Sequence, residues 1–406
     1  MNSRLNNLIF EVENKRRFRP VRSLDIMLKA FNDLEIDLSL VKKVHVTGTN
    51  GKGSTAKTIQ NILYKSDKNN IVGLYTSPYL EKFNERIRIN SLDISNSDLE
   101  FYLEFILNFN DKFEENYHES LTFFELTTLM AFKYFKDKKC NYLVIEVGIG
   151  GSFDPTNILN YDISVITSIG YDHMQQLGFS LEEILSNKLG ILKDNGTLFT
   201  TVDSSFYSQM ESDAKNKNAK LFLFDTESIY KRNNSFFLEG YKFKVNLLGD
   251  YQINNAYLAI KVSLYLINDL DLNKVKKIIR EIKFKGRLEK IEENLYIDGA
   301  HNEHALRNVI NSLPNIFVNK KIGIVFSCLA DKDVSTMIDI LNNSKLEFIV
   351  TSFKDLRFKD LIPRISSARY IEYFPQAIEE LKKTNDIVLV LGSIHFIGLV
   401  RKYFKG

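Results

Sequence analysis

The sequence is poor in several residue types that would otherwise define its class. It has two cysteines, six prolines and no tryptophan among 406 residues, and its formal net charge is +3. Cys140 and Cys328 both lie in apolar, strand-like surroundings, so we expect reduced core residues of a cytoplasmic protein and no disulfide framework. A net charge this small gives no support for a nucleic-acid partner.

Long hydrophobic runs are also missing. The N-terminus shows no apolar signal-peptide region, and the most apolar late stretch, residues 387–400, is interrupted by Ser393 and His395 and is too short to span a bilayer. We therefore expect no membrane partner. One local run, residues 15–22, is basic; we interpret it as a solvated segment, with an anion-attracting rim as the alternative.

What the sequence does contain is an ordinary globular composition, with 44% hydrophobic and 26% charged residues. From residue 21 to about residue 224, helical and strand-like patterns alternate, which predicts a parallel sheet with helices on both faces. Because the pattern restarts after Gly286, we expect a first domain over 1–285 and a smaller α/β domain over 286–406. No heptad seam is visible, so a monomer is expected.

Individual elements follow from the same patterns. In the first domain we expect strands at 44–47, 71–75, 85–89, 142–147 and 163–168, and helices at 21–36, 98–109, 121–136 and 251–266. A hairpin is expected at 236–245, with its turn at Glu239-Gly240. In the second domain we expect strands at 295–298, 322–327, 348–352 and 387–391.

The stretch 44–55 predicts a phosphate-binding loop over residues 47–55. An apolar strand stops at Gly48, a loop with Gly51 and Gly53 carries the single lysine Lys52, and a helical pattern begins at Ser54. Glycines let successive backbone N–H groups face an anion, and the helix N-terminus adds its dipole. The spacing departs from the usual phosphate loop, so a glycine-rich turn in an ordinary α/β protein is the alternative.

Two further positions are candidates for chemistry at strand ends. Glu146 is the one acid at the end of the apolar strand 142–147, and a carboxylate there needs a cation. Near a phosphate loop that cation is Mg²⁺, which prefers oxygen ligands; a buried acid paired with Lys or Arg is the alternative. Asp172 and His173 follow the next strand, and we expect them beside Glu146 at the carboxyl edge of the sheet.

Several short segments, taken in order, resemble the motifs of the folate branch of the Mur ligase superfamily, which comprises folylpolyglutamate synthase and dihydrofolate synthase. The segments are 46–54, 76–78, 122–125, 146–151, 154–157, 168–173 and 298–302, and 391–393 extends the likeness over nearly the whole chain. Departures from the family pattern are Tyr79, Ser152, Pro155, Leu189 and Glu303, none of them a metal or phosphate residue.

The resemblance implies a fold and an activity. The fold is a phosphate-loop domain with a central parallel sheet, like the Mur ligase middle domain, followed by a smaller Rossmann-like α/β domain. The activity is ATP-dependent joining of L-glutamate to dihydropteroate, to tetrahydrofolate, or to both, through an acyl phosphate, and we favour the bifunctional enzyme. A monofunctional folylpolyglutamate synthase is the alternative. A cell-wall Mur ligase is disfavoured because only 43 residues precede Val44.

Other classes of function receive less support from the sequence. A nucleotide-binding regulator without ligase chemistry would lack Lys52, Glu146 or His173, and all three are present. A nucleic-acid-dependent ATPase would need a basic stripe or an aromatic platform.

The resemblance also assigns roles to individual residues. For ATP it implies Thr49, Asn50, Gly51, Lys52, Gly53 and Ser54 at the phosphates, Gln252 and Asn255 beside the adenine, and Arg287 and Asp298 completing the site. For metal it implies two Mg²⁺ sites with ligands from Ser77, Glu146, His173 and a carbamylated Lys188. Lys52, His173 and Lys188 would take part directly in catalysis. For the pterin it implies Thr122, Phe124, Glu125, Phe153, Asp154 and Pro155.

Two of these assignments have an ordinary alternative. From the residues alone, Lys188 is a helix-surface lysine, and Phe124 is as well explained as a core aromatic as by stacking on a pterin ring.

Overall fold

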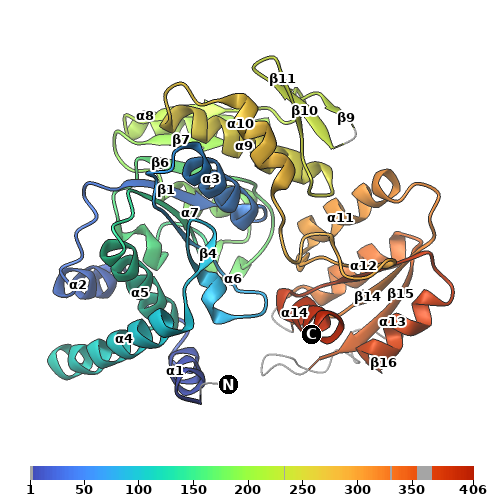
Figure 1. The fold of residues 1–406 in the computed structure, drawn as a ribbon, viewed down its shortest axis with the longest axis horizontal. Coiled ribbons are helices and arrows are strands. Elements are labelled where there is room, and N and C mark those ends of the chain that lie inside the picture. Colours follow the sequence, from blue (N-terminus) through green and yellow to red (C-terminus); the bar gives the residue numbers. More distant parts are fainter. Residues whose placement is uncertain (1–2, 233, 330–331, 354–367) are drawn as a thin grey trace. The chain divides into compact units, whose positions relative to one another are not determined.

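The computed structural model describes residues 3–232, 234–329, 332–353 and 368–406 (Figure 1). These residues form two compact units. The first contains Met1–Ile169, His173–Ile229 and Asn255–Ile278, and the second contains Gly170–Asp172, Tyr230–Asn254 and Ile279–Gly406. The segment Gly170–Asp172 thus belongs to the second unit, although the residues on both sides of it belong to the first. A domain boundary near Gly286 stays a prediction.

The first unit is built on a mostly parallel sheet. Within the described residues, this sheet has eight strands in the order β4-β3-β2-β5-β1-β6-β7-β8. The strands are β1 Lys42–Thr47, β2 Val72–Tyr75, β3 Ile87–Ile89, β4 Leu92–Asp93, β5 Tyr142–Glu146, β6 Ile163–Ile166, β7 Thr197–Thr200 and β8 Lys220–Leu223. All neighbours from β2 to β8 in this order are parallel, whereas β3 and β4 form an antiparallel edge.

Helices cover both faces of this sheet. They are α1 Ser3–Glu13, α2 Asp25–Asp33, α3 Lys52–Ser66, α4 Asn96–Tyr117, α5 Phe123–Asp137, α6 Met174–Leu177, α7 Leu181–Leu189 and α8 Tyr207–Asn216, with short 3₁₀ turns η1 Phe83–Arg86, η2 Pro155–Ile158 and η3 Ser204–Phe206. Helices α9 Asp250–Leu266 and α10 Leu272–Glu281 follow, each crossing from one unit to the other in sequence.

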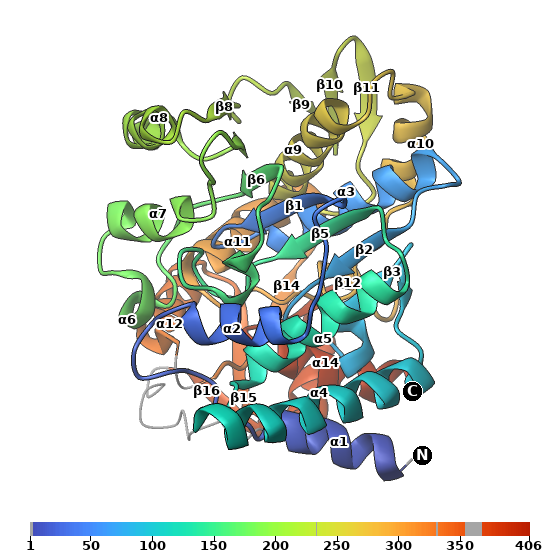
Figure 2. The ribbon, with the colours of Figure 1, turned by 90° about the vertical axis from the view of Figure 1, so that its left-hand side faces the viewer.

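Alternation along the central strands explains the two helical layers. On β5, Leu143 and Ile145 pack into a cluster with residues of α4 and α5, whereas Val144 packs on the opposite side with α3 and α9. Successive strand residues point to opposite faces, so a fully apolar strand must be covered twice. On the first of these faces α1 packs on α4, and α4 packs on α5 (Figure 2).

The second unit contains a smaller sheet and a hairpin. Its described strands follow the order β12-β13-β17-β14-β15-β16, parallel apart from β12. The strands are β12 Glu289–Lys290, β13 Leu295–Ile297, β14 Ile322–Phe326, β15 Glu347–Ser352, β16 Arg369–Tyr373 and β17 Ile387–Leu391, and the helices are α11 Glu303–Ile316, α12 Val334–Asn343, α13 Phe374–Lys382 and α14 Ile394–Lys405. A separate antiparallel sheet is formed by β9 Lys231–Arg232, β10 Ser235–Leu238 and β11 Tyr241–Lys244.

Most predicted elements are confirmed, including the hairpin at Glu239-Gly240, but the strand predicted at 85–89 is wrong in its first half. Residues Phe83–Arg86 form η1 and only Ile87–Ile89 is a strand. The reason is local: the Glu85 carboxylate accepts the backbone N–H of Leu80 at 2.8 Å and closes a turn. Helix α4 is longer than the predicted 98–109, and α1 was not predicted.

None of the helices in the described part of the chain combines the length and apolar character needed to cross a bilayer.

Candidate active site

The phosphate loop joins β1 to α3 and is shaped by glycine. Helix α3 begins at Lys52, two residues earlier than the predicted start at Ser54, with Gly51 as its N-cap. Gly51 has φ +85°, which favours glycine, and a Cβ there would lie 2.3 Å from the Asn255 Oδ1 atom. The structure therefore brings Asn255, a predicted adenine-side residue, directly against the loop.

The loop is tied to the segment that follows β6. The backbone N–H of Thr49 donates to Ser168 O at 2.8 Å, and that of Asn50 donates to the Ser168 hydroxyl at 2.9 Å. The Thr167 hydroxyl donates to Asn50 O at 2.6 Å. The Lys52 side chain points back toward the loop, and its ammonium donates to the carbonyls of Gly48 and Thr49 at 2.9 and 3.2 Å. The predicted lysine is thus held at the mouth of the loop.

Glu146 ends β5 and faces the same loop. Its side chain is buried, and its Oε2 atom accepts the backbone N–H of Ser77 at 3.2 Å. The Cβ position of Gly53 lies 3.3 Å from that same oxygen. Three predicted residues, Ser77, Glu146 and Gly53, therefore meet at one point beside the start of α3.

The donors at this point suit Mg²⁺. The described residues contain no group of three or more His, Cys, Asp or Glu side chains that could hold a metal ion. The predicted Mg²⁺ ligands do not form such a group, because only Glu146 and His173 are of these residue types and the third ligand is the Ser77 hydroxyl. Mg²⁺ keeps several waters and takes one or two carboxylates together with substrate phosphates. A carboxylate and a hydroxyl beside a phosphate loop fit that preference.

His173 follows β6, which comes after β5 along the chain, and its place beside Glu146 stays a prediction. Strand β1 lies between β5 and β6, so Glu146 and His173 come from strands on either side of the strand that carries the phosphate loop. His173 has φ +49° and precedes α6. The residue before it, Asp172, accepts hydrogen bonds from Asn302 at 2.9 Å and from the Lys332 ammonium at 2.8 Å.

His301 lies near this carboxylate in the second unit. Its Nε2 atom is 3.9 Å from an Asp172 oxygen, and its Nδ1 atom is 2.7 Å from Gly299 O. Burial, together with the nearby Lys332 ammonium, lowers the pKa of His301 to about 4, against the opposing effect of Asp172. His301 is therefore neutral at physiological pH.

Lys188 is not a surface lysine, and that interpretation is corrected by the structure. Its side chain lies on α7 with the residue only 2% exposed. The helix begins at a capping box formed by Ser180 and Glu183, and its last turn contacts the glycine loop after β5, where Ser152 N–H donates to Asn187 O at 2.9 Å. A buried lysine is the type whose chemistry is most easily altered by its surroundings.

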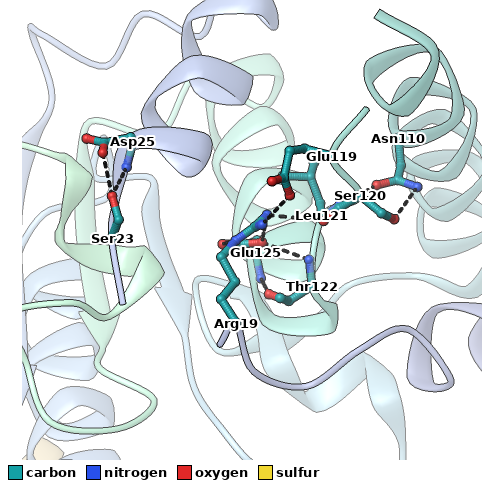
Figure 3. A network of polar contacts seen from close by, with 9 residues as sticks. All are labelled: Arg19, Ser23, Asp25, Asn110, Glu119, Ser120, Leu121, Thr122 and Glu125. Carbon is teal, nitrogen blue, oxygen red and sulfur yellow. Dashed lines mark hydrogen bonds and ion pairs between the residues drawn. The ribbon is translucent and has the colours of Figure 1, made fainter. Parts of the chain in front are cut away.

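Thr122 and Glu125, predicted on the substrate side, form the cap of α5. The Thr122 hydroxyl accepts the Glu125 N–H at 3.3 Å, and the Glu125 carboxylate accepts the Thr122 N–H at 2.7 Å. Glu125 also accepts two bonds from the Arg19 guanidinium, at 2.7 and 2.9 Å (Figure 3). Arg19 further donates to Glu119 at 3.0 Å and to Ser120 O at 3.1 Å.

Arg19 is an exception within the basic run 15–22, in which Arg16, Arg17 and Arg22 are exposed, as a solvated segment requires. Its side chain is 11% exposed and its partner Glu125 is 5% exposed. The sequence carried no signal for this pairing, because the two residues are 106 positions apart.

Phe124 and Asp154 meet at the loop that follows β5. A Cβ at Gly148 would lie 2.6 Å from the Phe124 ring and 3.1 Å from Asp154 Oδ2, so only glycine allows this approach. Phe124 is partly buried, with its ring 5.9 Å from that of Tyr75. Phe153 is 52% exposed, and Pro155 begins η2. Burial raises the pKa of Asp154, against hydrogen bonds from Thr156 and from the backbone N–H groups of Ile149 and Gly148.

In the second unit, Arg287 and Asp298 lie close together. Asp298 is buried and accepts the backbone N–H groups of Leu288 and Ala300, each at 2.8 Å. Burial raises the pKa of Asp298, and the nearby Arg287 guanidinium opposes that rise. Gln252, the remaining predicted residue, is 2% exposed on the first turn of α9.

Comparison with known proteins identifies the family. A model of the Mur ligase middle domain matches residues 46–263, and a model of the Mur ligase glutamate ligase domain matches residues 286–394. The dihydrofolate synthase/folylpolyglutamate synthase of Bacillus subtilis is 32% identical over 90% of this chain and 91% of that protein. The folylpolyglutamate synthase of Lacticaseibacillus casei is 31% identical over 73% of each chain.

Solved structures agree with this result. A folylpolyglutamate synthase complex with AMPPCP and folate has 26% identity and a TM-score of 0.86, and the match covers 99% of this chain and 100% of that one. The ligand-free bifunctional folylpolyglutamate synthase/dihydrofolate synthase of Yersinia pestis has 26% identity and a TM-score of 0.84, covering 100% and 99%. The predicted fold class and family are thereby confirmed, and the chain belongs to the dihydrofolate synthase and folylpolyglutamate synthase branch of the Mur ligase superfamily.

Proposed function

We propose that this protein is an ATP-dependent ligase that joins L-glutamate to dihydropteroate and to reduced folates such as tetrahydrofolate. One observation carries the proposal: a glycine loop with Lys52 at its mouth lies against the buried carboxylate of Glu146, in a chain of this family. Relatives named for both activities, and others named for one, support the bifunctional enzyme with a monofunctional folylpolyglutamate synthase as the alternative.

The chemistry explains why ATP is needed. A carboxylate is a poor electrophile, so an amine does not displace oxide from it. Its oxygen first attacks the γ-phosphorus of ATP, the bond to ADP breaks, and an acyl phosphate forms. The glutamate nitrogen then attacks the acyl carbon, loses a proton, and inorganic phosphate leaves as the amide bond forms. Positioned cationic groups and N–H donors stabilise the charge that moves in the first step.

The nucleotide is assigned to the loop and its neighbours. The backbone N–H groups of residues 49–54 face the phosphates, Lys52 neutralises them, and Asn255 lies at the adenine side with Gln252. Arg287 and Asp298 are assigned to the same nucleotide, as the resemblance implies. When bound, Mg²⁺ would supply charge neutralisation, held by Ser77, Glu146 and His173.

Lys188 is proposed to become carbamylated and to hold a second Mg²⁺. The ammonium first loses a proton, and the neutral amine then adds to CO₂ and releases a second proton, which gives an anionic oxygen ligand of the kind that Mg²⁺ prefers. The burial of Lys188 supports this assignment, because a buried lysine is the type whose chemistry its surroundings alter most readily.

The pterin is assigned to the side of the loop after β5. Phe124 offers a ring face, Asp154 offers acceptor oxygens, and Phe153 and Pro155 border the same loop. Thr122 and Glu125 position Phe124 on this side through the cap of α5. We place the reaction in the cytoplasm, since the only two cysteines of the sequence, Cys140 and Cys328, are both buried in the core, and we expect a monomer.

The test is phosphate release from ATP by the purified protein with Mg²⁺ and L-glutamate, with dihydropteroate or tetrahydrofolate added separately. Release with each pterin, with the glutamylated product identified by mass, is expected. Release with one pterin alone would limit the enzyme to that activity. ATP binding without release in either case would refute the proposal.

Two variants and one control tie the activity to the site. Lys52→Met is expected to lower the rate by about a hundredfold or more, because it removes a cation from the phosphates. Glu146→Gln is expected to raise the Mg²⁺ concentration needed for half-maximal rate. Lys68→Met is the control, since Lys68 is exposed just beyond the end of α3, and it should keep full activity.

A further inference from the structure

His45 occupies an unusual place for a histidine. It lies in the middle of β1, the strand that runs into the phosphate loop, and its side chain is completely buried. Its ring stacks on that of Tyr161 with 3.9 Å between centroids and 10° between planes. Its Nε2 atom is 2.8 Å from the Thr156 hydroxyl, whereas no described residue hydrogen-bonds to its Nδ1 atom.

The hydrogen bonds beyond Thr156 run in one direction. The Thr156 hydroxyl donates to Asp154 Oδ1 at 2.5 Å, and the Thr156 backbone N–H donates to the same oxygen at 3.0 Å. The other oxygen of Asp154 accepts the backbone N–H of Ile149 at 2.9 Å. Both oxygens of Asp154 therefore act as acceptors.

Counting protons then fixes the state of His45. A threonine hydroxyl has one proton, and here that proton goes to Asp154, so the hydroxyl must accept from His45. His45 consequently carries its proton on Nε2 and has a bare Nδ1, in agreement with the lack of a described partner for that atom. Burial lowers the pKa of His45 well below its ordinary value, which keeps the ring neutral.

We propose that His45 is a positioning residue that acts through Thr156 to hold the Asp154 carboxylate in the orientation that receives the N–H donors of a pterin ring. This inference rests on the proposed function. Two further contacts support it: the Thr47 hydroxyl donates to Gly150 O at 2.5 Å, and the Tyr161 hydroxyl donates to Thr156 O at 2.6 Å. The loop that carries Asp154 is thus held by three hydrogen bonds, two from β1 (His45 and Thr47) and one from Tyr161.

The competing explanation is that His45 only fills space in the core. The two explanations differ in what they change. A space-filling residue affects the amount of folded protein and leaves the Michaelis constants alone. A positioning residue affects the KM for the pterin and leaves the KM for ATP and for glutamate nearly unchanged.

The kinetic test compares His45→Gln with His45→Leu, and Thr156→Ser with Thr156→Val. Glutamine can place an N–H near the position of Nε2, and serine keeps the hydroxyl, so each first variant is the matched control for the second. His45→Leu and Thr156→Val are expected to raise the KM for dihydropteroate about tenfold, the effect of one hydrogen bond to a charged group. The KM for ATP should change less than twofold. Equal changes in both constants, or in neither, would overturn the inference.

A second measurement does not depend on activity. Nitrogen-15 NMR of histidine side chains reports which ring nitrogen carries the proton, and the His45 signal among the six histidines is identified by its loss in His45→Gln. The Nε2–H tautomer is expected. The Nδ1–H tautomer would refute the hydrogen-bond chain from His45 through Thr156 to Asp154, even if the protein were fully active. The expected tautomer in a protein that glutamylates no pterin would support that chain. It would overturn the proposed function and the pterin-positioning role.

Discussion

Replacement of Arg19 by methionine removes one partner of a buried ion pair and keeps most of the length of the side chain. The Arg19 and Glu125 side chains are 11% and 5% exposed, and two hydrogen bonds of 2.7 and 2.9 Å join them (Figure 3). In the Arg19→Met variant the Glu125 carboxylate stays buried without its cation. Breaking a buried pair in this way costs about 3–5 kcal/mol of unfolding free energy.

The structure indicates where that loss comes from. The contact of Arg19 with Glu119 contributes little, because Glu119 is 46% exposed. The hydrogen bond from Thr122 N–H to Glu125 remains in the variant, so the cap of α5 persists. The loss of stability comes from the Glu125 charge, which stays buried without a cation. Removing both charges, in Arg19→Met with Glu125→Gln, should cost less than the sum of the single changes, with a coupling energy of about 1–3 kcal/mol.

The assay is urea unfolding of the wild type, the two single variants and the double variant. Far-ultraviolet circular dichroism and tyrosine fluorescence are the probes, since the chain has no tryptophan. Arg4→Met is the matched control: Arg4 also pairs with glutamates, but its side chain is 60% exposed, and its loss should cost less than about 1 kcal/mol. If Arg19→Met cost no more than Arg4→Met, or if the single costs were additive, the reasoning would be refuted.

Three other substitutions test separate parts of the structure. Arg86→Met should change the unfolding free energy by less than about 1 kcal/mol from the wild type, or raise it. The reason is that the buried Arg86 packs on three aromatic rings and its Nε has no partner among the described residues. Urea unfolding measures this difference. Gly148→Ala should displace the Phe124 ring, which lies 2.6 Å from the new Cβ, and raise the KM for dihydropteroate without changing that for ATP. Lys332→Met should raise the pKa of His301 from about 4 toward its ordinary value, because a nearby cation is lost and the Asp172 carboxylate remains. NMR titration measures this pKa, and an unchanged value would show that Lys332 does not contribute to it.

The sequence predicted those features that depend on neighbours along the chain. Glycine spacing identified the loop between β1 and α3, and mostly apolar runs identified β5 and β6 as strands. The hairpin of β10 and β11 followed from its Glu239-Gly240 turn. The candidate residues at the ends of these strands were found for the same reason, since the carboxyl ends of parallel strands share one edge of a sheet.

Features that depend on partners far away in the chain were not predicted. The burial of Arg19 requires Glu125, and no local pattern links the two. Lys188 has the spacing of a surface residue on a short helix, and only the packing of α7 makes it a buried one. Residues 85–89 alternate as a strand should, yet Glu85 turns back to bind the N–H of Leu80, so its polarity served a turn and not a solvated strand face.

Strand β1 shows how one element can serve two sites. Val44 and Val46 face the cluster that includes α3, while His45 and Thr47 contact the segment from residue 150 to residue 156. On that second face the His45 ring contacts the Thr156 hydroxyl and the Thr47 hydroxyl donates to Gly150 O. The Lys43 backbone N–H donates to Asp162 at 2.8 Å, next to the pairing of β1 with β6. The strand that ends in the phosphate loop is therefore also the support of the loop that carries Asp154. Backbone hydrogen bonds on both sides fix the register of β1, and the Thr47 hydroxyl joins the two loops through Gly150 O. Substitutions on the α3 face of β1 should then act on stability and on ATP together, while those on the opposite face should act on the pterin.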